Sequence, residues 1–175
     1  CAGLKLSRTP AGAPCCWLPR RTGSVQGAQP SHAVQASYHS EMDAITADPR
    51  VQAALQYVVG VKEKSQKELI ELTEIPAPPF KEDVRAAHFA KMLKEAGIKD
   101  VQIDGAGNVI GRRPGKTGSK VVAYAAHLDT VFPEGTDVTV KFDGEKMRAP
   151  GIGDNTRGLV TVLEVIGALQ SANIE

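Results

Sequence analysis

Residues 121–131 read VVAYAAHLDTV. The first six positions are apolar in succession rather than in alternation. A strand with two apolar faces is typical of a sheet that helices cover on both sides. We therefore predict a central strand over Val121–Ala126 in an α/β fold, with His127 and Asp129 at its carboxyl end, where open α/β sheets bind their ligands.

Helical patterns fill two segments upstream of this stretch. Asp48 and Pro49 provide an N-cap followed by proline at the first helical position. Apolar residues then recur at helical spacing as far as residue 72, with a break expected at Gly60, until three prolines end the pattern. A second helix is predicted from Glu82 to Gly97, where the glycine ends it.

Two hairpins are predicted, one over 101–112 around GAG and one over 138–148 around Asp143-Gly144. The glycine spacing of the first hairpin imitates a dinucleotide-binding fingerprint. That motif must open a helix, whereas Val109, Ile110 and Pro114 follow here. A dinucleotide-dependent oxidoreductase would require a helix after Gly107, and we expect a strand there.

The last element follows Asp154 and is apolar on nearly all sides over residues 159–169. Such a helix must be buried on most of its surface. The sequence stops directly behind it at Glu175 and has no initiating methionine, so we expect a fragment cut at both ends. The predicted fold is a three-layer α/β/α sandwich with a mixed, mainly parallel sheet, incomplete at its C-terminal end.

The first 40 residues differ in character from the rest. They hold four of the 21 basic residues and none of the 20 acidic ones, so residues 41–175 carry a net charge of −3. All three cysteines lie there, at positions 1, 15 and 16, without the spacing of a zinc or disulfide framework. We predict a disordered tail or linker over 1–40 and one domain over 41–175.

The net charge and the lengths of the apolar runs limit the classes of binding partner. The whole chain of 175 residues has net charge +1, and its longest apolar runs are far shorter than the ~20 residues of a membrane helix. We expect neither nucleic acid nor a membrane as partner. The compartment stays undetermined, with the cytoplasm slightly favoured over export.

His127 and Asp129 are the first candidate site residues. In extended backbone, residues two apart project to the same side. A neutral imidazole can offer one nitrogen to a metal while its other N–H needs an acceptor, which Asp129 would supply. The alternative is a strand-end histidine beside an unrelated turn aspartate.

Asp154 is the second candidate, in the glycine-bracketed run PGIGDNTRG at 150–158. It could simply cap the helix that follows. It could also be a carboxylate held near the positive helix end and able to bridge two cations. The order of the two motifs, separated by roughly 25 residues with a hairpin between, favours the second interpretation.

The motifs HLDTV at 127–131 and GIGDNTRG at 151–158 together resemble the dinuclear zinc exopeptidases that include carboxypeptidase G, peptidase T and the aminoacylases. IPAPPF at 75–80 and DGAGNV at 104–109 are similar to peptidase T-like members, and the resemblance covers about residues 50–170. It implies that His127 ligates one metal, that Asp129 orients this histidine in a catalytic role, and that Asp154 bridges both metals. The implied cofactors are two divalent ions, zinc first, with cobalt or manganese as alternatives.

The chain departs from that family in two ways. The Glu-Glu pair, which supplies the general base and a ligand in the family, occurs nowhere in the sequence, and the later acidic and histidine ligands are also missing. We therefore expect 41–175 to be the N-terminal half of a metallopeptidase catalytic domain, inactive by itself. The parent enzyme would cleave peptide or N-acyl amino acid amide bonds, and the full-length protein could be a homodimer. The alternative is a non-catalytic domain of related fold without metal. Substrate-binding residues stay unknown; Arg157 is either a contact for an anionic substrate group or a surface arginine.

Overall fold

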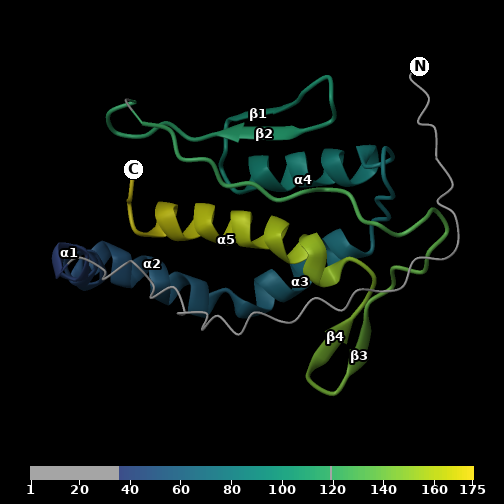
Figure 1. The fold of residues 1–175 in the computed structure, drawn as a ribbon, viewed down its shortest axis with the longest axis horizontal. Coiled ribbons are helices and arrows are strands. Elements are labelled where there is room, and N and C mark those ends of the chain that lie inside the picture. Colours follow the sequence, from purple (N-terminus) through teal and green to yellow (C-terminus); the bar gives the residue numbers. More distant parts are fainter. Residues whose placement is uncertain (1–35, 119) are drawn as a thin grey trace, which may run out of the picture. The chain divides into compact units, whose positions relative to one another are not determined.

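Five α-helices, one π-helical turn and two β-hairpins make up residues 36–118 and 120–175, the part of the chain that the computed structural model describes (Figure 1). In chain order they are α1 (Ala36–Ala47), α2 (Pro49–Gly60), α3 (Lys62–Thr73), α4 (Asp83–Glu95), β1 (Asp100–Ile103), β2 (Val109–Arg112), β3 (Lys141–Asp143), β4 (Lys146–Arg148), η1 (Ile152–Thr156) and α5 (Arg157–Ser171). Most of the predicted tail, residues 1–35, lies outside the described residues. Its expected end near residue 40 falls inside α1.

The ends of the central helices follow from local signals. Asp48 accepts a hydrogen bond from the Arg50 amide at 2.8 Å, and Pro49 occupies the first helical position of α2. The expected break occurs at Gly60, after which α3 begins at Lys62. Gly97 follows α4 with φ 87°, a left-handed conformation that glycine adopts without strain.

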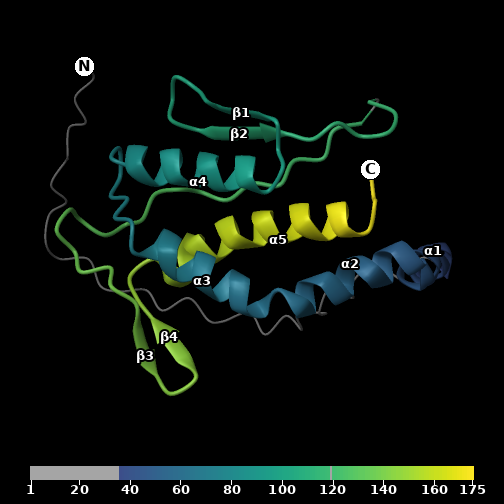
Figure 2. The same ribbon diagram turned by 180° about the vertical axis from the view of Figure 1, so that it is seen from behind.

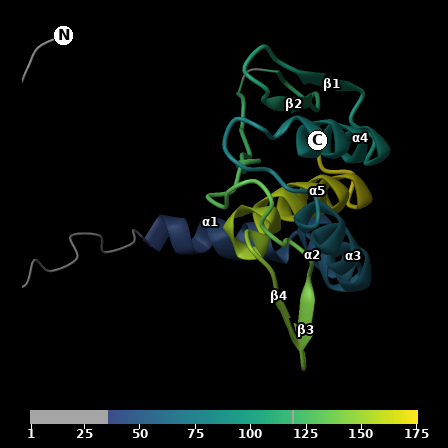
Figure 3. The same cartoon turned by 90° about the vertical axis from the view of Figure 1, so that its right-hand side faces the viewer.

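The core lies where α3, α4 and α5 meet. Leu72, Leu159 and Val160 are almost entirely inaccessible to solvent. The remaining buried core residues are Leu69, Phe89, Met92, Leu93, Ile98 and Leu163. Figures 1 and 2 show α5 between α4 on one side and α2 with α3 on the other, and Figure 3 shows the same order along the helix axes.

Both hairpins form as separate two-stranded antiparallel sheets. The first pairs Ile103 with Val109, and the Asp104 side chain accepts two backbone N–H bonds across its turn. The strand β2 thus follows Gly107, so the helix required for dinucleotide binding is absent at that position. In the second hairpin Asp143 pairs with Lys146, which places the turn one residue later than predicted.

The predicted strand over Val121–Ala126 does not form in the described residues. Val121 and Val122 are 93% and 73% exposed, and neither hairpin extends to pair with this segment. Ala126 and Leu128 nevertheless pack against the core, and Figure 1 shows the segment running alongside α4 and α5. A strand needs a hydrogen-bonded neighbour, and no part of residues 36–118 or 120–175 provides one. The three-layer sandwich remains a prediction.

No helix among these residues has both the length and the apolar character that crossing a membrane requires.

Candidate metal site

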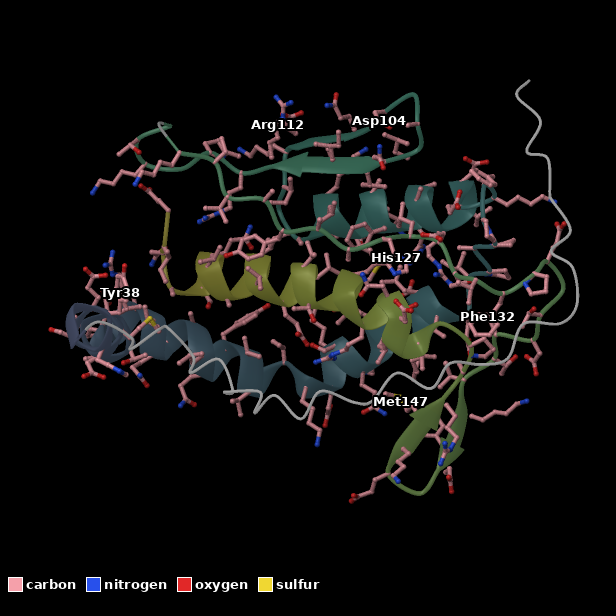
Figure 4. All side chains as sticks on the ribbon, in the orientation of Figure 1. Tyr38, Asp104, Arg112, His127, Phe132 and Met147 are labelled. Atoms are coloured by element: carbon pink, nitrogen blue, oxygen red, sulfur yellow. The ribbon has the colours of Figure 1, made fainter. Side chains whose placement is uncertain are left out.

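His127 lies on an extended segment that is fastened to the core at alternate residues. Leu128 packs against the core, and the buried Thr130 donates its backbone N–H to the Ala77 carbonyl at 2.8 Å. Alternation in extended backbone therefore turns His127 and Asp129 away from the core. Figure 4 shows His127 close to the start of α5.

Two carboxylates flank the imidazole of His127, one at each ring nitrogen. Nε2 lies 2.9 Å from Oδ1 of Asp154, and Nδ1 lies 3.0 Å from Oδ1 of Asp129. Nδ1 is also 3.0 Å from the Asp129 carbonyl oxygen. The structure therefore brings together all three residues singled out in the sequence, although His127 follows an unpaired extended segment instead of ending a strand.

Asp154 lies within η1, at a kink just before α5. Its backbone is extended, with φ −128° and ψ 94°, and the peptide bond that follows it is cis. Within the described residues, α5 has no side-chain cap, and the Asp154 carboxylate is bonded only to His127. The side chain is 89% exposed, so it is accessible to a ligand from solvent. The capping interpretation of Asp154 does not match this geometry.

The two carboxylates favour the charged imidazolium. The hydrogen bond with Asp154 is the main reason that the pKa of His127 lies above its usual 6.5; partial burial opposes this effect, and Asp129 adds to it. A metal ion at Nε2 would compete with a proton for this nitrogen, so metal uptake is expected to depend on pH.

The donor set fits a zinc-type ion but is small. Imidazole nitrogen and carboxylate oxygen are both zinc ligands at about 2 Å, and two such ligands on one ion lie roughly 3 to 4 Å apart. The 2.9 Å between Nε2 and Oδ1 is close to that separation. Catalytic zinc sites usually have three protein ligands, however, and no group of three histidine, cysteine or acidic residues within the described ranges could hold a metal. Within the described residues, His127 and Asp154 alone therefore do not make up a complete metal site.

Residues 108–174 match the model of Peptidase family M28. The matched segment includes His127, Asp129 and Asp154 and is a little over a third of the chain. The match indicates a relationship with zinc-dependent peptidases in general, and it does not single out the carboxypeptidase G, peptidase T and aminoacylase group. A comparison with curated proteins gives no match.

Arg157, at the start of α5, and Tyr124, three residues before His127, face a common groove. They line an open groove of about 320 Å³ together with Ala125, Gly153, Asn155, Gly158, Thr161, Val162 and Val165. The Arg157 guanidinium lies 3.6 Å from the carboxylate of Glu164, so part of its charge is already compensated. Its role toward an anionic substrate group stays a prediction.

The remaining histidines of the described residues lie on helices α1 and α4. Nε2 of His88 on α4 lies 2.9 Å from Oε1 of Glu71 on α3. His39 lies on α1 and is exposed. His32 and the three cysteines lie outside the described residues.

Arg85 is the functional candidate that sequence reasoning missed. It is 1% exposed, and its Nη1 donates to the carbonyl of Leu128, between His127 and Asp129. A signal was present, because Arg85 precedes Phe89 by four residues and Met92 by seven. It therefore shares the buried stripe of α4 with them.

Proposed function

We propose that this chain is part of a metal-dependent peptidase that hydrolyses peptide or N-acyl amino acid amide bonds. The observation that carries the proposal is the placement of His127, with Asp129 at one ring nitrogen and Asp154 at the other. The M28 match over the same residues supports it.

Each residue has a distinct part in the proposal. His127 would ligate metal through Nε2, and Asp154 would ligate the same ion and bridge to a second. Asp129 accepts from Nδ1 and so fixes the ring orientation and tautomer that leave Nε2 free for metal. The bound ions would polarise the scissile carbonyl and lower the pKa of a water molecule. The chain has no Glu-Glu pair, so we assign no general base within it and propose that it does not turn over substrate alone.

A finer assignment rests on the motifs. HLDTV at 127–131 followed by GIGDNTRG at 151–158 supports a two-zinc exopeptidase related to carboxypeptidase G, peptidase T and the aminoacylases. A peptide or acyl amino acid would then be the substrate, and a homodimer of the full-length protein is part of this proposal. The motifs do not distinguish recognition of an amino end from that of a carboxyl end.

The second candidate is that the chain is a non-catalytic domain that binds no metal. The observation favouring it is the absence of a third ligand near His127 and Asp154 within the described ranges. In this case the His127 imidazolium would simply form hydrogen bonds with the two carboxylates.

Metal titration separates the two functions. Purified chain is titrated with Co²⁺, followed by visible absorption, and with Zn²⁺, followed by calorimetry. The peptidase proposal predicts weak binding that is lost in both His127→Ala and Asp154→Ala. Asp129→Asn should bind about 10- to 100-fold more weakly than the parent chain, the usual effect of losing an outer-shell partner.

His88→Ala is the matched control, because His88 also faces a carboxylate but lies between α3 and α4. It should leave Co²⁺ binding unchanged. Binding that persists in both His127→Ala and Asp154→Ala, or no binding by the parent chain at millimolar metal, would overturn the peptidase proposal in favour of the non-catalytic domain.

A further inference from the structure

Arg85 lies at the start of α4 with its guanidinium buried among backbone carbonyls. Nε and Nη2 donate to the carbonyl of Ile75 at 3.0 and 2.5 Å. Nη2 is also 3.4 Å from the carbonyl of Thr73, the last residue of α3. Nη1 donates to the carbonyl of Leu128 at 3.0 Å. One side chain therefore connects the end of α3, the loop after it and the segment that carries His127.

A charge at this position is costly. Burial lowers the pKa of Arg85, and the nearby Asp129 carboxylate partly opposes that effect. Arginine stays protonated in proteins, so the fold retains a buried cation. In the described part of the chain Arg85 has no carboxylate within ion-pair distance, and carbonyl oxygens supply its compensation.

Stability alone does not account for this arginine. Arg85 lies on the stripe of α4 that buries Phe89 and Met92. An apolar residue on that stripe would pack without the desolvation cost of a guanidinium. The planar fork of arginine, however, spreads five N–H donors over three nitrogens and can reach acceptors on separate segments, whereas lysine has its three donors on one nitrogen.

The fastening of residues 128 and 130 controls the direction of Asp129 between them. Leu128 is held by Arg85 through its carbonyl, and Thr130 is held by Ala77 through its N–H and its hydroxyl, at 2.8 and 3.2 Å. Both contacts lead to the same loop after α3, at Ile75 and Ala77. With the peptides on both sides of Asp129 fixed, its carboxylate and the imidazole of His127 project together from the core.

We propose that Arg85 is a positioning residue for the His127–Asp129 pair, acting by anchoring the Leu128 carbonyl to the loop after α3. Without this anchor, Asp129 leaves Nδ1 of His127 for part of the time, and Nε2 is no longer held toward the metal side. The consequence for metal binding rests on the proposed function. The anchoring of residues 127–130 does not.

The test uses the full chain with Arg85→Met, which keeps most of the apolar stem, and Arg85→Lys, which keeps the charge without the fork. Met92→Ala is the matched control, because Met92 is buried on the same stripe of α4 two turns further along. Urea denaturation measures the global stability of all three variants. Hydrogen exchange and Co²⁺ affinity, described below, are then compared between variants at equal global stability.

The first measurement is amide hydrogen exchange, which needs no metal. Hydrogen exchange of the Thr130 amide is followed by NMR under conditions of local opening. In Arg85→Met this amide should exchange at least about tenfold faster than in Met92→Ala, with Arg85→Lys in between. Equal exchange in Arg85→Met and Met92→Ala overturns the positioning role. If Arg85→Met does not fold, the comparison of Arg85→Lys with Met92→Ala decides in the same way.

The second measurement is the affinity for Co²⁺, followed by visible absorption. Arg85→Met should bind Co²⁺ about 10- to 100-fold more weakly than Met92→Ala. If the parent chain binds no Co²⁺ while the Thr130 amide still responds to Arg85, the peptidase proposal fails and the positioning role of Arg85 stands. If Co²⁺ binds equally to both variants and the amide does not respond, Arg85 only caps α3.

Discussion

Gly151, three residues before Asp154, packs against Thr130, three residues after His127. Replacement of Gly151 by alanine should therefore be unusually destabilising. Its φ is 75°, in the left-handed region. A Cβ atom built on it would lie 2.6 Å from Cγ2 of Thr130. Thr130 cannot easily move away, because it is buried and both its amide and its hydroxyl are bonded to the Ala77 carbonyl.

Two separable costs add up in Gly151→Ala. A left-handed conformation costs an alanine roughly 1–2 kcal/mol. Forcing an extra methyl group against a fixed neighbour adds roughly 1–3 kcal/mol. Gly144→Ala is the matched control, because Gly144 also has positive φ, 58°, but would place its Cβ in open space. It should lose only the first amount.

Urea denaturation of the whole chain measures both substitutions, and Thr130→Ser completes the design. Serine keeps the hydroxyl and removes the Cγ2 methyl, so Gly151→Ala should cost about 1–3 kcal/mol less in a Thr130→Ser background than in the parent. If Gly151→Ala and Gly144→Ala cost the same within about 0.5 kcal/mol, or if Thr130→Ser gives no relief, the close packing of Gly151 on Thr130 is refuted.

Two further predictions concern the core and the charge of His127. Leu72→Ala should lower the free energy of unfolding by about 2–5 kcal/mol, because Leu72 is fully buried. Leu55→Ala, at a half-exposed position on α2, should lower it by about 1 kcal/mol or less. Equal losses of stability in urea denaturation would contradict the assigned core. Since the pKa of His127 is raised in the folded chain, its stabilising effect is fully present below the unfolded pKa of about 6.5 and is lost as pH rises through the folded pKa. Urea midpoints measured with a chelator present should therefore fall across that interval in the parent and stay flatter in His127→Gln; parallel profiles would show that the carboxylates do not hold the imidazolium.

Local signals predicted most of the helices and both hairpins. Asp48 with Pro49 marks the start of α2, Gly97 ends α4, and the glycines at 105 and 107 form a turn. Each of these features depends on backbone and side-chain chemistry within a few residues. The strand over Val121–Ala126 depends instead on a neighbour elsewhere in the chain, and an apolar run specifies burial without specifying which segment pairs with it.

The candidate site likewise has features that depend on local sequence and features that depend on distant segments. The alternation of an extended segment was enough to place His127 and Asp129 on one side, because it is a property of three consecutive residues. The distance from His127 to Asp154 depends on the path of the chain over the 26 residues between them. Only the order of the two motifs and the resemblance to known enzymes suggested that these residues meet. Arg85 was missed for a different reason. Its spacing from Phe89 and Met92 placed it on the buried face of α4, but a charged residue is ordinarily assigned to the surface. A charged residue at a buried helical position should instead prompt a search for the acceptors that compensate it. For Arg85 those acceptors include the carbonyl of Leu128, within the segment that positions His127.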